Sequence, residues 1–238
     1  MTQQPPLDPV EAFAALGNIR LGETDLDGVL ARVADLAKQT IPGTTDVSVT
    51  LIRGKDAHTA AFTGELAVAL DEWQYEHGHG PCLDASAAPA TLSLPDMSTE
   101  ERWPDYAARA VKAGVNSSLS IGLMLREAVT GALNVYADKP GAFDDDAIIL
   151  GQTFAAYATV ALANAHLYDT QATLAKQMQA AMESRAVIEQ AKGIIMGDRR
   201  CTPDEAFVVL TKLSQDTNRK LRDVAALLVA RAANTPRS

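Results

Sequence analysis

The sequence predicts an α+β domain followed by one long helix and a compact bundle of three helices. Up to Tyr136, strand-like alternation of apolar and polar residues is interspersed with helical spacing. From Asp144 to the residue before Gly193, glycine occurs only at Gly151 and proline does not occur, which indicates a continuous or nearly continuous helix. The last part of the chain contains three amphipathic helical patterns with short links between them, which is typical of a small helical bundle.

The α+β domain is predicted to begin with a helix at Asp25–Ile41, whose apolar residues recur at helical spacing and which Pro42-Gly43 ends. The segment Asp46–Ile52 alternates apolar and polar residues and is predicted to be a strand. The other elements expected on the same grounds are strands at His58–Thr63, Leu92–Leu94, Ser117–Leu125 and Gly131–Tyr136, helices at Leu66–Tyr75 and Trp103–Ala113, a turn at Arg53–Asp56 and a loop at His77–Pro81.

The long helix carries a weak heptad pattern. Apolar residues lie seven apart at Leu167, Leu174, Ala181 and Ile188, and Met178 occupies an intermediate position. The other intermediate positions hold the polar residues Gln171 and Arg185. A long helix without a globular core of its own usually pairs with another helix, so a coiled-coil-like homodimer is expected.

The three helical patterns of the bundle differ in how clearly their ends are marked. The first ends at Gly197-Asp198, and the second begins with a capping box in which Thr202 is the N-cap and Glu205 the third helical residue. Phe207 falls on the apolar stripe of the second pattern and is expected in the core. The apolar residues of the three patterns are Val187, Ile188, Ala191, Ile194 and Ile195; Ala206, Phe207, Leu210 and Leu213; and Leu221, Val224, Ala225 and Leu228.

The net charge of −9 by itself argues against a nucleic-acid partner, but the charge is unevenly distributed. The segment Glu183–Ser238 contains ten Lys/Arg and seven Asp/Glu. The first ten residues lack the basic and apolar regions of a signal peptide, and no apolar stretch is expected to be long enough to cross a bilayer. A cytoplasmic protein without membrane contact is therefore expected. Cys82 and Cys201 lie in separate halves and predict neither a disulfide nor a metal cluster.

The segment from Ser184 to Val229 resembles the ANTAR domain, the RNA-binding module of transcription antitermination regulators. The residues that match are Ser184-Arg185, Ile188–Met196 (IEQAKGIIM), Pro203–Phe207 (PDEAF) and Asn218–Ala225 (NRKLRDVA). They cover essentially the whole module with its spacing intact.

The segment from about Asp25 to Tyr168 resembles the GAF domain that precedes ANTAR in many actinobacterial regulators. The residues that match are Gln74–Asp84 (QYEHGHGPCLD), Trp103-Pro104, Gly114–Leu119 (GVNSSL) and Gly131–Tyr136 (GALNVY). The expected organisation is therefore an N-terminal tail or short helix at residues 1–24, a GAF sensor domain at 25–168, a helical linker at 169–183 and an ANTAR domain at 184–238.

The resemblance implies RNA binding by the exposed side of the first ANTAR helix and by a second basic group. A helical wheel places five residues opposite the apolar ones: Arg185, Glu189, Lys192, Gly193 and Met196. An exposed helical glycine costs about 1 kcal/mol relative to alanine, so Gly193 indicates close approach by a partner. The alternative is that Gly193 only loosens the helix end and that Lys192 is a solvated charge. The residues expected to bind RNA are Arg185, Gln190, Lys192, Gly193, Asn218, Arg219, Lys220 and Arg222.

A small-molecule site is expected in the GAF half, next to its glycine-rich segment. The residues expected to line it are Trp73, Tyr75, Cys82 and Trp103. Alternatively both tryptophans belong to the core, and Cys82 is a small buried residue at a helix start rather than a redox-sensitive thiol. Leu83 follows this cysteine where bilin-carrying GAF domains often have histidine, and the spacing of His77, His79 and Cys82 is not a recognised metal-ligand pattern. No cofactor is indicated.

The resemblance implies a non-enzymatic, signal-responsive regulator that binds paired hairpin loops in a nascent transcript as a dimer and prevents terminator formation. The transcription machinery would be affected indirectly. One alternative is a small-molecule or redox sensor that acts through protein contacts. A second is a GAF-type methionine sulfoxide reductase, which would need a resolving cysteine near Cys82.

Overall fold

The protein is described by a computed structural model that covers residues 6–20, 23–54, 56–88, 90–126 and 129–234. It divides into two compact units, Met1–Asp169 and Thr170–Ser238. The predicted class is confirmed, since a five-stranded antiparallel sheet with helices is followed by one long helix and two further helices. The turn expected at Arg53–Asp56 includes Lys55, which lies outside the described residues, as do residues 1–5 and 235–238.

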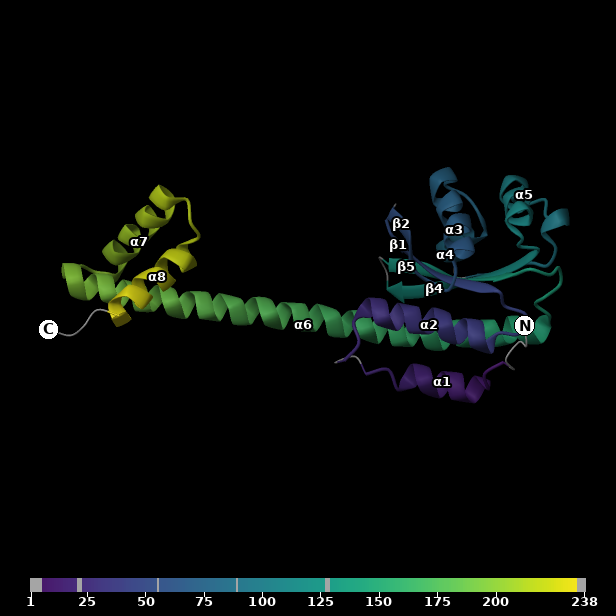
Figure 1. Cartoon of the computed structure of the whole chain (residues 1–238), viewed down its shortest axis with the longest axis horizontal. Helices are drawn as coiled ribbons and strands as arrows, with labels where there is room; N and C mark the ends of the chain where they lie inside the picture. The colour runs from purple at the N-terminus through teal and green to yellow at the C-terminus, as the bar shows by residue number, and fades with distance from the viewer. Residues whose placement is uncertain (1–5, 21–22, 55, 89, 127–128, 235–238) are drawn as a thin grey trace. The chain divides into compact units, whose positions relative to one another are not determined.

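The sheet of the first unit has the strand order β2-β1-β5-β4-β3, and every neighbouring pair is antiparallel (Figure 1). All five predicted strands are present, with ends shifted by at most two residues. Their bounds are β1 Asp46–Arg53, β2 Asp56–Phe62, β3 Thr91–Leu94, β4 Ser117–Arg126 and β5 Val129–Ala137.

The helices of the first unit include one that the sequence did not predict, α4 at Pro81–Ala87. The loop expected at His77–Pro81 is therefore shorter. Helix α3 continues to His77 and ends at the left-handed Gly78, while Pro81 occupies the first turn of α4, where a proline loses no helical hydrogen bond. The remaining bounds are α1 Pro9–Gly17, α2 Leu26–Thr40, α3 Glu65–His77, the 3₁₀ helix η1 Met97–Thr99 and α5 Pro104–Ala113.

The two faces of the sheet have different chemistry, and helices cover both. On one face, apolar residues such as Val49, Val135 and Leu119 pack against α2 and the first part of α6, and α1 packs on the same core. Helices α3, α4 and α5 lie on the other face (Figure 1). The strand residues that point to these three helices are largely polar yet buried: Ser48 and Thr50 of β1, Ser118 and Ser120 of β4, and Asn134 of β5. The polar residues of the alternating strands are therefore buried as well, on the opposite face of the sheet from the apolar ones.

The second unit contains the end of α6 (Asp145–Arg199), α7 (Pro203–Thr217) and α8 (Leu221–Asn234). Its core consists of Ala191 and Ile195 of α6, Ala206 and Leu210 of α7, and Ala225 of α8. The capping box is confirmed: the Thr202 hydroxyl accepts a hydrogen bond from the Glu205 amide at 3.3 Å, and the Glu205 carboxylate accepts one from the Thr202 amide at 2.9 Å.

Three expectations about side chains of this unit are wrong. Leu213, which was expected on the apolar stripe of α7, is 39% exposed. Phe207 is 43% exposed, because three short helices bury only a narrow stripe that Ala206 and Leu210 already fill. Met196, which the helical wheel placed on the exposed side, packs against the core. The predicted helix end at Gly197-Asp198 is also slightly early, since α6 continues to Arg199.

Among the described residues, one helix is long and apolar enough to cross a membrane by length and composition alone. This is α6, whose most apolar window has a mean hydropathy of 1.4. The sequence reading missed it because alanines and single polar residues interrupt the stretch, although no Asp, Glu, Lys or Arg lies between Asp146 and Asp169. One side of this stretch, including Phe154, Ala158 and Leu162, is buried in the core of the first unit.

Candidate functional site

A cluster of buried polar side chains lies between the sheet and helices α3 and α4, with Asp71 of α3 at its centre. The Asp71 carboxylate is fully buried and accepts hydrogen bonds from the Tyr136 hydroxyl at 2.6 Å and the Thr59 hydroxyl at 3.0 Å. The amide nitrogen of Asn134 lies 3.3 Å from the same carboxylate and 3.1 Å from the Thr50 hydroxyl. These contacts join α3 to β1, β2 and β5 through hydrogen bonds rather than apolar packing.

Cys82 belongs to the same cluster. Its sulfur lies 3.2 Å from the Thr50 hydroxyl and 3.2 Å from the Asn134 amide nitrogen, and its backbone amide donates to the Gln74 side-chain oxygen at 2.9 Å. Gly80 has a φ of +147°, and a Cβ at this position would overlap the Gln74 side chain. The glycine-rich motif therefore brings the start of α4 close enough to α3 for this contact.

Burial changes the acidity of the cluster. Desolvation raises the pKa of Asp71 to about 6, although three hydrogen bonds to the carboxylate oppose the shift. Desolvation, assisted by the neighbouring Asp71 charge, raises the pKa of the Cys82 thiol to about 12. The pKa of Tyr75 is raised for the same two reasons. At neutral pH the thiol and the phenol are therefore uncharged.

Three buried polar atoms lack a well-formed hydrogen bond within the described residues: the side-chain oxygen of Asn134, and the hydroxyls of Tyr106 and Ser118, which lie near each other. An unsatisfied buried polar atom costs about 1–3 kcal/mol. A small polar molecule or an ordered water that bonded to these atoms would recover part of that free energy.

Two of the four residues expected to bind a ligand, Tyr75 and Cys82, belong to this cluster. Tyr75 bonds to the Thr50 hydroxyl at 2.8 Å, and Cys82 contacts the same hydroxyl, so the two share one partner. Trp103 is 8% exposed and its indole nitrogen donates to Asp84 at 3.1 Å, which is a core position with one polar contact. Trp73 stacks on His77, with ring centroids 4.0 Å apart.

Sequence reasoning missed Asp71, Asn134 and Tyr136 as members of the cluster. The available signal was an asparagine in the middle of the apolar segment Gly131–Tyr136, together with an acid on the face of α3 that also carries Leu70 and Gln74. Both cysteines are free, and the described residues contain no group of three His, Cys, Asp or Glu that could hold a metal ion.

The burial of Cys82 predicts that it resists thiol reagents. With a pKa of about 12, its thiolate fraction at pH 8 is on the order of a thousandfold below that of a free cysteine, and the sulfur is also inaccessible. Native protein treated with a disulfide reagent is expected to release one equivalent of chromophore, from the partly exposed Cys201. The second equivalent should appear only on unfolding. A rapid reaction in the native Cys201→Ser variant would show that Cys82 is accessible and reactive.

The expected RNA-binding residues of α6 differ in exposure. Arg185, Gln190 and Gly193 are exposed, and a Cβ added at Gly193 would meet no atom within 4 Å. Lys192 is more buried, with a side chain 15% exposed and its ammonium 2.9 Å from the carboxylate of Glu189. Lys192 must therefore break its ion pair with Glu189 before it can bind another anion.

The second expected group lies between α7 and α8. Asn218 ends α7 in the left-handed conformation, with φ 51° and ψ 39°, a role that asparagine tolerates well. Arg219 and Lys220 are exposed in the link, and Arg222 lies in the first turn of α8, 3.4 Å from Asp223. Both side chains of that ion pair are about half exposed, so the pair contributes little to stability. Arg222 can therefore leave Asp223 and bind another anion.

Two family models match the chain. The model of the GAF domain matches residues 23–163, which is more than half of the chain, and the model of the ANTAR domain matches residues 176–229. The protein belongs to the family of GAF–ANTAR regulators, as its sequence motifs predicted. ANTAR is an RNA-binding antitermination domain and GAF is a sensor domain, so the chain joins sensing and RNA binding in one regulatory protein.

Solved structures share the fold of the GAF domain at low sequence identity. The GAF domain of a cyanobacterial phytochrome with bound phycoerythrobilin has a TM-score of 0.53 and 13% identity, over 68% of this chain and 97% of that one. The free methionine-R-sulfoxide reductase of Neisseria meningitidis with its substrate has a TM-score of 0.52 and 18% identity, over 67% and 88%. Reduced fRMsr of Staphylococcus aureus has a TM-score of 0.53 and 16% identity, over 68% and 99%. No curated protein sequence matches the chain.

Proposed function

We propose that this protein is a cytoplasmic, signal-responsive regulator that promotes transcription antitermination by binding paired hairpin loops in nascent transcripts. The observation that carries the proposal is the open surface at Gly193, on a domain that matches the ANTAR model and has basic residues in the α7–α8 link. Because paired loops need two binding domains, the active form is a homodimer. Stabilising these hairpins would prevent the terminator from forming, and the transcription machinery is affected indirectly.

The residues proposed to bind RNA fall into two groups: one contacts the phosphate backbone of the RNA and the other contacts its bases. Arg219, Lys220 and Arg222 are exposed cations next to the first amides of α8, and a helix start favours phosphate. At Gly193 an unstacked loop base can approach the helix α6 closely, and the side chains of Arg185 and Gln190 can contact the edge of that base. Since the whole protein carries a charge of −9, non-specific attraction to RNA is weak and affinity has to come from these local contacts.

This division predicts a change in salt dependence. Arg219→Gln or Lys220→Gln is expected to reduce the slope of log affinity against log salt by about 0.7, the value for one phosphate contact on single-stranded RNA. Filter binding of the full chain to a two-hairpin RNA at several salt concentrations measures the slope. Lys212→Gln, which removes an exposed cation of α7 outside the proposed surface, should leave it unchanged. Equal slopes for all three variants would contradict the assignment.

For the GAF domain, we propose that the signal is a small molecule recognised next to the buried polar cluster, near Tyr75 and Cys82, with Trp73 and Trp103 at its border. The buried side-chain oxygen of Asn134 and the poorly satisfied hydroxyls of Tyr106 and Ser118 support this proposal. A change in melting temperature with one member of a metabolite library, absent in Asn134→Leu, would support it. A redox signal through Cys82 and reductase chemistry are less well supported, because the thiol is buried and protonated.

A further inference from the structure

Phe207 is the only aromatic residue in the sequence of the second unit, and it does not belong to the core of that unit. Its side chain is 43% exposed, whereas the buried residues of the core are alanine, isoleucine and leucine. A phenyl ring can bury more apolar area than any of these, so a bundle that depended on Phe207 for stability would enclose it. The exposed ring is therefore available to a partner.

The ring lies on a side of α7 that leads to the basic link between α7 and α8. At 3.6 residues per turn, three polar residues fall within about 40° of Phe207 around the helix: Thr211, Ser214 and Asn218. The Ser214 hydroxyl donates to the carbonyl oxygen of Arg219 at 2.5 Å, so this side of the helix also fixes the backbone of the link. An exposed aromatic ring, polar groups and the exposed cations of the link therefore follow one another along α7.

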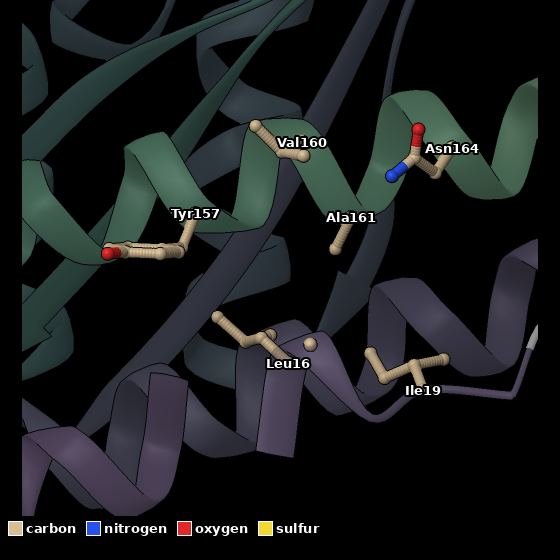
Figure 2. Close-up of a pocket in the computed structure, with 7 residues that line it drawn as sticks. Leu16, Ile19, Tyr157, Val160, Ala161 and Asn164 are labelled. Carbon is tan, nitrogen blue, oxygen red and sulfur yellow. The ribbon is translucent and has the colours of Figure 1, made fainter. Parts of the chain in front are cut away.

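The surroundings of this ring differ from those of Tyr157, an aromatic residue of the first unit that is 52% exposed. Tyr157 lines a mostly apolar hollow, and Figure 2 shows Leu16 and Ile19 opposite it. Among the described residues that line this hollow there is no Lys or Arg. Along α7, in contrast, no acidic residue occurs from residue 206 to residue 215, and cations follow the helix. An aromatic ring close to cations is typical of a surface that binds single-stranded nucleic acid.

The RNA contacts proposed above leave the flat face of the loop base uncovered. Gly193 permits close approach, and the side chains of Arg185 and Gln190 can reach only the edge of the base. A base that leaves its stack loses stacking free energy, which an aromatic side chain can restore. Gly193 and Phe207 each lie within about two turns of the link that joins α6 to α7, so both belong to the same end of the bundle.

We propose that Phe207 stacks on the face of an unpaired base in the RNA loop and that this side of α7 belongs to the RNA-binding surface. The inference rests on the proposed function, because it adds a residue to the same RNA site. Since every base has a flat aromatic face, this contact increases affinity without selecting the loop sequence. Protein is a less suitable partner, because only one ring on this side is apolar and its neighbours carry hydroxyl and amide groups.

Filter binding of the full chain to a two-hairpin RNA tests the stacking contact. Phe207→Leu keeps an apolar side chain that favours helix but removes the ring, and is expected to raise the dissociation constant by about tenfold or more. Phe207→Tyr retains the ring and should bind within about twofold of the parent. Val208→Thr is the control: Val208 is 65% exposed next to Phe207 but faces another side of α7, so its replacement should not change binding.

Two further measurements distinguish stacking from the other proposed contacts. The slope of log affinity against log salt should be the same for Phe207→Leu and the parent, because the ring carries no charge. The relative affinities for loops of different sequence should also be the same, whereas a base-reading contact would change them.

The inference fails if the parent binds the RNA and Phe207→Leu binds it as tightly, or if Phe207→Tyr binds as weakly as Phe207→Leu. It also fails if Phe207→Leu changes the sedimentation coefficient of the protein without RNA, because the ring would then lie in a contact between protein chains. A parent that does not bind two-hairpin RNA overturns the proposed function itself, so the two failures are distinguishable.

Discussion

Replacing Gly193 with leucine is expected to weaken binding of a two-hairpin RNA by about tenfold to a hundredfold, the effect of losing a base-reading contact. A Cβ at this position meets open space, so the leucine fits without displacing any neighbour within the protein. Leucine is also the better helix former by up to about 1 kcal/mol, so the thermal stability of the ANTAR domain should not fall. Filter binding and a thermal melt of the same preparation separate the two effects.

Ala232→Leu is the control for the Gly193 variant. Ala232 is an exposed small residue near the end of α8, ten residues beyond Arg222 and outside the proposed RNA surface. The substitution Ala232→Leu introduces the same side chain as the Gly193 variant, and the resulting protein should bind RNA as tightly as the parent does. If Gly193→Leu also binds like the parent, Gly193 lies outside the interface and the exposed side of α6 is not the base-reading surface.

Replacing Asp71 with asparagine is expected to stabilise the GAF domain at pH 8 by up to about 3 kcal/mol, the free energy that corresponds to the rise in its pKa from 3.8 to about 6. The folded-state pKa lies above the unfolded one, so the ionised carboxylate opposes folding above about pH 6. This penalty disappears as the pH falls below about 4. The difference in stability between variant and parent should therefore shrink from pH 8 to pH 4. The amide oxygen of the asparagine can still accept from the Tyr136 hydroxyl, whereas its NH2 group would donate to the Thr59 hydroxyl, which in the parent donates to the carboxylate.

Urea unfolding followed by tryptophan fluorescence measures this difference, because both tryptophans, Trp73 and Trp103, lie in the first unit. Glu72→Gln changes the adjacent, exposed acid of α3 and should alter stability by no more than about 0.5 kcal/mol at any pH. A variant that is less stable than the parent at pH 8 would mean that the hydrogen bonds of the carboxylate outweigh its desolvation.

Sequence patterns identified most of the secondary structure because the signals are local. Helix spacing, the proline and glycine at residues 42–43 and the capping box at Thr202 depend on neighbouring residues alone, and these elements formed where expected. Helix α4 was missed because seven residues are too few to show a period. Phe207 and Met196 were misplaced because a helical wheel shows which residues share a side but not how wide the buried stripe is.

The buried polar cluster could not be predicted from the same patterns. Alternation in β1 marks Ser48 and Thr50 as sharing one face, but it does not reveal that α3 and α4 cover that face. The contacts of Asp71 with Asn134 and Tyr136 span more than 60 residues of sequence and depend on strand order. The assignment of RNA-binding residues came from the motif and remains a proposal, although the exposure of Gly193 agrees with it.

Crosslinking of the full-length protein to RNA in its native cell, followed by sequencing of the bound fragments, tests the proposed function most directly. If the protein is an antitermination regulator, crosslinks should concentrate in pairs of hairpin loops upstream of terminators and fall to background for Gly193→Leu. Crosslinks spread along transcripts without preference for loops, or equally frequent in parent and variant, would contradict recognition of paired hairpins by the ANTAR domain.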